Sequence, residues 1–388
     1  MLFKDVIVEQ ELKDQLISLV KETRISHAQL FLSPPGTHAF ALAIAYAQFL
    51  CCENRSESDS CGTCPSCQKF EKLSHPDLHL IFPNCITKKV KKDPDSNLFA
   101  QDFKNFVFKN NYHIDIDDWL TELEGENKQA SINMRDCSNI INQNSVRSYE
   151  GGYKIYILWC ADRLYHSAAP KLLKTLEEPE NNTLFILLTE NPDKILTTIL
   201  SRTQLVKIPR LQTATIEKQL IQEFNIPQQK AEDIAYIAEG NYTIARRLTL
   251  ESSQLREILK NFEIIFSSAI SLSTRKSHEQ IRFNDVKEIF SEIIAKGREE
   301  QKSFIKYMTR CIRNILMIHM GNDQMVMASS SEKKVLYTFK DYVTLKNSSA
   351  LLHECNSAIF HIERNGNSAL VFTDLYLKLS QIMAPQNP

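Results

Sequence analysis

The sequence predicts an α/β domain built on a parallel sheet, followed by an all-α region. A short β-prone run at 29–33 leads through a loop containing proline and glycine into a helix, which is a strand–loop–helix unit. Residues 154–159 and 183–189 are continuous apolar runs, typical of strands buried on both faces of a sheet. A helical pattern at 161–178 joins these two runs into a βαβ unit, and strand signals stop after Pro209.

The length of 388 residues predicts two or three domains. We expect the α/β domain over 1–210, a small domain of two or three short helices over 211–250, and a helical domain over 251–388. The last of these looks suited to packing or assembly rather than chemistry, because its helices have strong apolar faces and few ionisable clusters. One such face is formed by Leu351, Leu352, Cys355, Ala358, Ile359 and Ile362.

The composition is that of a soluble globular protein, with 43% hydrophobic and 24% charged residues. A net charge of −1 excludes the strong basic field of a stand-alone nucleic-acid binder. The longest apolar stretch, 39–50, is shorter than the ~20 residues of a bilayer span, and the N-terminus is charged from Lys4 onward. We therefore expect a cytoplasmic protein without a membrane segment, whose ten cysteines are free thiols or metal ligands rather than disulfides.

Residues 84–130 interrupt the α/β pattern with a charged, turn-rich stretch followed by mixed aromatic and acidic residues. We expect a partly ordered insertion at the periphery of the sheet. A solvated surface elaboration is favoured here over a binding site.

Four cysteines in a module at 51–67 have the spacing C-x8-C-x2-C-x2-C, and they are Cys52, Cys61, Cys64 and Cys67. Four thiolates at this spacing can surround one Zn²⁺, and an iron–sulfur cluster or a set of free cysteines are the alternatives. Because four thiolates close the site, the zinc would be structural. Cys51 could replace Cys52 as a ligand, whereas His75 is expected to make a loop hydrogen bond instead.

The loop after the first strand occupies the place of a phosphate-binding loop, whose pattern is G-x-x-x-x-G-K-[ST]. Gly36 survives inside the loop. The other pattern positions are changed: the two glycine positions hold Ser33 and His38, Ala39 stands for the lysine, and Phe40 stands for the Ser/Thr.

The end of the strand at 154–159 lacks the paired acids that hold Mg²⁺ and activate water in an ATPase. Trp159 and Cys160 stand there instead. Without the lysine, the metal ligand and the base, we predict negligible ATP affinity and no intrinsic hydrolysis.

Several segments together resemble the bacterial clamp-loader AAA+ family, which contains the gamma/tau motor subunits and the delta-prime subunit. The similarity lies in RISHAQLF (24–31), in CGTCPSCQ (61–68) with HPDLH (75–79), in the long segment 153–204, in GNYTIARRL (240–248) and in RNGNSALVFTDLYLKL (364–379). The resemblance implies an AAA+ domain with a zinc module, a lid domain at 211–250 and a collar domain at 251–388. The lost ATP-site residues point to delta-prime rather than gamma/tau.

The same resemblance gives Arg202 a role. TILSRT (198–203) is similar to the family's S-R-C motif with Thr203 in place of cysteine, and the family's arginine reaches the ATP of a neighbouring subunit. An ordinary intrachain salt bridge is the alternative. The resemblance also places Thr243 at the sensor-2 arginine position and Thr189 on the sensor-1 strand, where we expect a hydrogen-bonding strand end.

The leading functional hypothesis is a non-hydrolysing subunit of the DNA polymerase III clamp loader. The resemblance implies gamma/tau motor subunits and a delta subunit as partners, and the sliding clamp and primed DNA as partners through the complex. One alternative is an atypical gamma/tau-like ATPase, against which the residues at 39, 159 and 160 argue. Another is a nucleic-acid-binding zinc module, which the net charge and the absence of aromatic–basic interleaving around 61–67 disfavour.

Overall fold

The computed structural model describes residues 1–123, 130–165, 167–250, 252–274, 283–326 and 328–384. The chain forms two compact units. The first is Met1–Ile216 with Gly240–Ile244, and the second is Glu217–Glu239 with Ala245–Pro388. The division into three domains at 210 and 250 stays a prediction.

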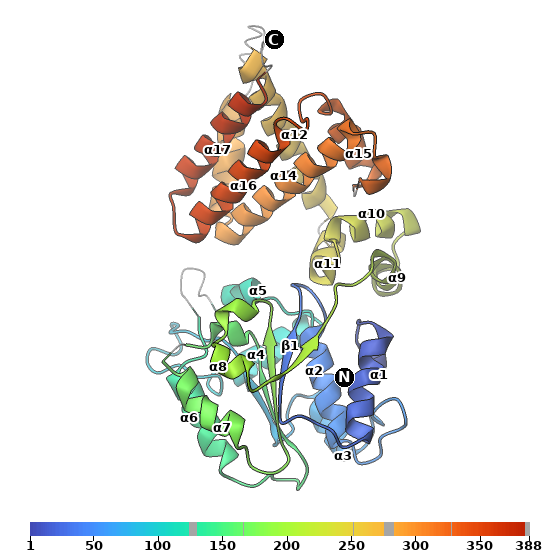
Figure 1. The fold of residues 1–388 in the computed structure, drawn as a ribbon, viewed down its shortest axis with the longest axis vertical. Coiled ribbons are helices and arrows are strands. Elements are labelled where there is room, and N and C mark those ends of the chain that lie inside the picture. The colour runs from blue at the N-terminus through green and yellow to red at the C-terminus, as the bar shows by residue number, and fades with distance from the viewer. Residues whose placement is uncertain (124–129, 166, 251, 275–282, 327, 385–388) are drawn as a thin grey trace. The chain divides into compact units, whose positions relative to one another are not determined.

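The first unit is built around a five-stranded sheet with the order β2-β3-β4-β1-β5, in which every neighbouring pair is parallel (Figure 1). The strands are β1 (Ala28–Leu32), β2 (Leu78–Ile81), β3 (Lys154–Leu158), β4 (Thr183–Thr189) and β5 (Gln204–Lys207). β3 and β4 are buried at every residue, which explains their continuous apolar sequences. This arrangement confirms the predicted parallel-sheet α/β domain.

Alternate residues of the strands feed two separate cores, because successive side chains of a strand point to opposite faces. Ile155 and Ile157 pack into one core with the helices α1 (Gln10–Lys21), α2 (Ala39–Cys51), α3 (Pro65–Glu71), α4 (Ala100–Lys109) and α5 (Ile116–Glu122). Tyr156 and Leu158 pack into the other core with α6 (Met134–Asn144), α7 (Ala169–Glu177) and α8 (Thr197–Leu200). Figure 1 shows α6 and α7 on the side of the sheet opposite α1 and α2.

The helix expected over 161–178 begins later, at Ala169. Residues Ala161–Arg163 form a short 3-10 turn, and Leu164 pairs with Ile132 in an isolated parallel bridge. Pro170 then occupies the first turn of α7, where its missing N–H costs nothing. The spacing of four from Leu164 to Ala168 therefore does not mark a helical turn, because the two residues lie in different local structures.

The second unit is helical over its described residues, as predicted. Three short helices, α9 (Thr213–Phe224), α10 (Gln228–Ala238) and α11 (Tyr242–Leu250), match the expectation for 211–250, although the first residues of α9 and α11 belong to the first unit. They are followed by α12 (Ser252–Thr274), α13 (Phe283–Ala295), α14 (Arg298–His319), α15 (Ser330–Thr338), α16 (Ser348–Glu363) and α17 (Ser368–Ile382). The predicted apolar face lies on α16, where Leu351, Cys355 and Ile362 are fully buried. Among the described residues, no helix combines the length and the apolarity needed to cross a membrane.

Candidate functional site

The loop between β1 and α2 is covered by groups from its own chain. The amide of Ser33 donates to the carbonyl of Thr189 at 3.0 Å, which continues the pairing of β1 with β4. Gly36 has a φ of +73° and its carbonyl accepts from the amide of Tyr242 at 3.0 Å. The side chain of Asn241 lies directly on Gly36, since a Cβ there would be 1.7 Å from its Oδ1. Glycine is thus required both by the backbone conformation and by this close approach.

The side chains that replace the phosphate-binding groups are buried among other rings. His38 is 2% exposed, its Nδ1 accepts from the amide of Ile7 at 3.0 Å, and its ring stacks on His113 at a centroid distance of 4.0 Å. Phe40 is 4% exposed and stacks on Tyr112 at 6.4 Å. Aromatic rings therefore fill the positions where the family pattern needs its second glycine and a hydroxyl.

A cavity of about 30 Å³ is what remains at this place. Six of the seven predicted positions line it: Ser33, Gly36, Ala39, Phe40, Trp159 and Cys160. Small-molecule sites usually have volumes of about 300–1,000 Å³, so this cavity is far smaller than a typical ligand site. The structure thus brings six of these residues together, and only His38 lies outside the lining.

The two residues that follow β3 are not acids. Trp159 is 7% exposed and its ring lies 5.5 Å from that of Phe103. Cys160 adopts a left-handed conformation with a φ of 55°, and burial raises the pKa of its thiol well above the usual value. The thiol is therefore protonated at neutral pH and is unsuited to act as a base. The hydroxyl of Thr189 donates to Asp162 at 3.1 Å, as expected for a hydrogen-bonding strand end.

The insertion at 84–130 differs from the prediction of a solvated, peripheral elaboration. Phe103 and Trp119 are fully buried, and the indole N–H of Trp119 donates to the carbonyl of Pro83 at 2.8 Å. The ring of Phe103 also stacks on that of Phe82 at 3.9 Å. The insertion is thus part of the core beside α2, although its lysines at 88, 89, 91 and 92 are exposed as expected. The prediction was wrong because charged residues dominate the composition while aromatic residues determine the packing.

The insertion also contributes to this cavity. Tyr112 and Ile114 line the cavity, together with Glu190 at the end of β4. Burial and the nearby Asp115 raise the pKa of Glu190 to about 7. None of these three residues was among those predicted from the sequence. Only Glu190 carried a usable signal, since it directly follows a strand of the parallel sheet.

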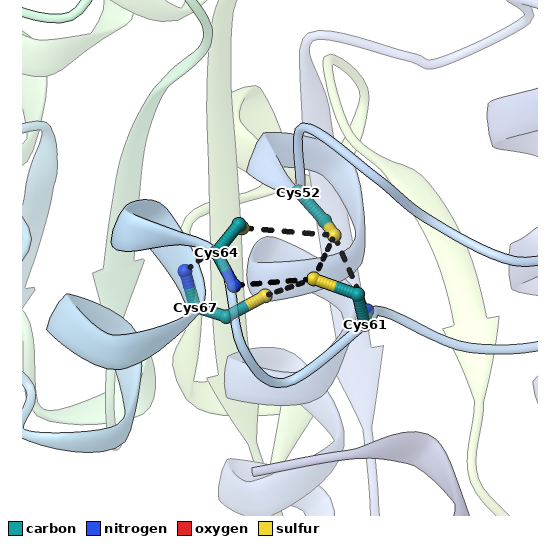
Figure 2. A group of neighbouring side chains, drawn as sticks. All are labelled: Cys52, Cys61, Cys64 and Cys67. Carbon is teal, nitrogen blue, oxygen red and sulfur yellow. Dashed lines mark hydrogen bonds between the residues drawn. The ribbon is translucent and has the colours of Figure 1, made fainter.

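The four predicted cysteines lie together, and their sulfur atoms are all within 4.8 Å of one another (Figure 2). The Sγ–Sγ distances are 3.5 Å for Cys52–Cys61, 4.0 Å for Cys52–Cys64 and 3.9 Å for Cys61–Cys67. Four sulfurs about 2.3 Å from one Zn²⁺ would be about 3.8 Å apart, so the donor set fits tetrahedral zinc. Cys51 is excluded from the cluster, because its thiol points to the carbonyl of Tyr153 at 3.7 Å.

Backbone N–H groups at this cluster favour the charged thiolate, which is the form that binds a cation. The N–H groups of Thr63 and Cys64 point at the sulfur of Cys61 and lower the pKa of its thiol to about 6. Burial instead raises the pKa of the Cys52 and Cys67 thiols, because it disfavours their charged thiolate form. A bound dication would favour the thiolates and lower these pKa values. His75 is not among these donors, since it pairs with Glu150 at 2.9 Å.

Arg202 lies on the surface in the turn between α8 and β5. Its guanidinium forms an ion pair with Glu177, and the two side chains are 35% and 43% exposed. The hydroxyl of Thr203 donates to the carbonyl of Leu200 at 3.1 Å, so the threonine of the changed motif supports the turn. Thr243, at the expected sensor-2 position, lies in the first turn of α11.

Comparison with known proteins decides the family. The family model described as DNA polymerase III, delta subunit, matches residues 8–212. The chain belongs to this family, as a delta-prime-like clamp-loader subunit. It is 27% identical over 314 residues to the DNA polymerase III subunit delta-prime of Bacillus subtilis (strain 168), covering 79% of this chain and 77% of that protein.

Two further proteins are similar to this chain. The subunit tau of the same Bacillus subtilis strain is 24% identical over 326 residues, covering 81% of this chain but only 50% of tau. A solved gamma-subunit-related protein of Thermotoga maritima matches with a TM-score of 0.42 at 14% identity, covering 95% of this chain and 99% of that one.

Proposed function

We propose that this delta-prime-like chain neither binds nor hydrolyses ATP, and that it serves a clamp loader by presenting Arg202 to ATP held by a neighbouring subunit. The observation that carries the first half is the filled site, where a cavity of about 30 Å³ is lined by Ala39, Phe40, Trp159 and Cys160. The second half is supported by the exposed position of Arg202 in a motif similar to the family's S-R-C motif.

The chemistry proposed for Arg202 is electrostatic. Phosphoryl transfer spreads negative charge over the oxygens of the terminal phosphate, and a guanidinium is permanently charged and donates in a planar fork. Such an arginine supplied from a neighbouring subunit raises hydrolysis by about 10³–10⁵-fold in other nucleotide hydrolases. The partners in this proposal are gamma/tau motor subunits and a delta subunit, and the assembled loader would place a sliding clamp on primed DNA in the cytoplasm.

The cysteine cluster supports a separate part of the proposal. Cys52, Cys61, Cys64 and Cys67 would hold one structural Zn²⁺, because four sulfur donors leave no coordination position for water or substrate. When bound, the ion would join the end of α2 to the start of α3.

Three measurements test the proposed function. Calorimetry of the purified chain with ATP should give no binding in the micromolar range, and the chain alone should not hydrolyse ATP. ATP turnover by the chain alone would favour the alternative of an atypical gamma/tau-like ATPase. In a loader assembled with motor subunits, Arg202→Ala should lower the ATPase rate by at least about tenfold, and an unchanged rate would contradict the role of Arg202.

A further inference from the structure

Arg202 is held against its own chain by contacts on every nitrogen of its guanidinium. Nε and Nη2 both contact Oε1 of Glu177. Nη1 donates to the carbonyl of Thr198 at 2.8 Å and to the hydroxyl of Ser201 at 3.3 Å. In this position the fork cannot offer two parallel N–H groups to a phosphate, so at least part of this set must break before Arg202 acts on another molecule.

Glu177 occupies a position that is electrostatically unfavourable within its own helix. Glu177 is the last residue of α7, and a carboxylate is unfavourable at the negative end of a helix dipole. Leu172 and Leu176 of the same helix are 2% exposed and fix α7 against the sheet. The carboxylate is therefore presented from a rigid support toward Arg202, and the contact with the guanidinium is what offsets its unfavourable place.

We propose that Glu177 is a positioning residue that restrains Arg202 until phosphate oxygens of a neighbour's ATP displace its carboxylate. This rests on the proposed function of Arg202. Carboxylate and phosphate compete for the same donors, and the phosphate chain with its greater charge is the stronger acceptor. The pair is 35% and 43% exposed, so water screens it and the exchange is readily reversible.

The strength of the ion pair sets the size of the expected effect on Arg202. An exposed ion pair changes an equilibrium by up to about fivefold. Removal of the carboxylate should raise the fraction of Arg202 that is free to engage ATP by a factor up to this size. The transition state itself is unchanged, because Glu177 no longer contacts the guanidinium once the phosphate has replaced it.

The experiment uses the full chain in a loader assembled with motor subunits and measures KM and kcat for ATP. Glu177→Gln keeps the shape of the side chain and removes its charge. We expect KM to fall by up to about fivefold with little change in kcat. The matched control is Glu178→Gln, which removes the same charge from the exposed neighbouring residue and should leave KM unchanged.

A double variant separates this inference from the function on which it rests. In an Arg202→Ala background, Glu177→Gln should have no effect on KM. If Glu177→Gln lowers kcat as Arg202→Ala does, the carboxylate holds the active arrangement and the restraint is refuted. If Glu177→Gln matches Glu178→Gln while Arg202→Ala still slows hydrolysis, the restraint fails and the proposed function stands. If Arg202→Ala leaves the rate unchanged, the proposed function itself has failed.

Discussion

Replacing Trp119 tests whether the insertion at 84–130 is a structural part of the α/β unit. Trp119 is fully buried, and its ring lies 5.4 Å from that of Phe82 and 5.2 Å from that of Phe103, each in an edge-on arrangement. Its indole N–H makes the hydrogen bond to Pro83. A surface elaboration would tolerate the loss of this side chain, whereas a core element would not.

The expected size follows from these contacts. Removing a buried tryptophan to alanine costs about 3–5 kcal/mol through lost transfer energy and the cavity left behind. The carbonyl of Pro83 loses its donor, which adds about 1–3 kcal/mol unless water enters the cavity. We therefore expect Trp119→Ala to lower the free energy of unfolding of this unit by about 4 kcal/mol or more. Trp119→Phe should cost less, since it keeps one buried aromatic ring and removes the rest of the indole with its N–H.

Urea unfolding followed by tryptophan fluorescence measures this unit selectively. Both tryptophans of the chain lie in it, and Trp159 still reports when Trp119 is replaced. The midpoint should fall by more than about 1 M. Leu98→Ala is the matched control, because Leu98 belongs to the same insertion but is 52% exposed and should change stability by less than about 0.5 kcal/mol. Equal midpoints for Trp119→Ala and Leu98→Ala would refute the assignment of the insertion to the core.

Two remaining predictions concern the metal and the nucleotide loop. Metal analysis should find about one zinc per chain. The Cys64→Ser variant should lose the zinc and the Cys51→Ser variant should keep it, because Cys64 belongs to the cluster and Cys51 does not. Zinc loss from Cys51→Ser would contradict the geometry. The double variant Ala39→Lys with Phe40→Thr restores the two family residues but leaves Tyr112 in the cavity, so calorimetry should still show no ATP binding. Micromolar binding would instead mean that the loop residues alone exclude nucleotide.

The sequence was sufficient for the elements whose burial is nearly complete. β3 and β4 were predicted because strands covered on both faces are apolar throughout. β5 was missed for the opposite reason. It is an edge strand of four residues, paired only with β1, and Val206 is its single buried side chain. It forms a strand by pairing with β1, which is far away in the sequence, so no local sequence pattern predicts it.

The candidate site shows the same limit at the level of single residues. Spacing identified the cysteine cluster, yet it could not choose between Cys51 and Cys52. The choice is made by the end of α2: Cys51 is its last residue and turns its thiol to Tyr153, whereas Cys52 has an extended backbone that carries its sulfur to the cluster. Likewise the pattern revealed lost ATP-site residues, but the filling of the site by Tyr112 arises from an insertion whose packing is a long-range property.

The filled loop has an energetic consequence for the proposed function. A nucleotide present at a thousand times its Kd would stabilise its binding domain by about 4 kcal/mol. Burial of two rings such as Phe40 and Tyr112, 4% and 8% exposed, contributes about 3–6 kcal/mol in its place. The two contributions are of similar size, but only the second is independent of ATP concentration. A subunit whose α/β unit is stabilised in this way would present Arg202 in the same manner whether ATP is abundant or scarce, so that nucleotide dependence would enter only through the neighbouring subunit.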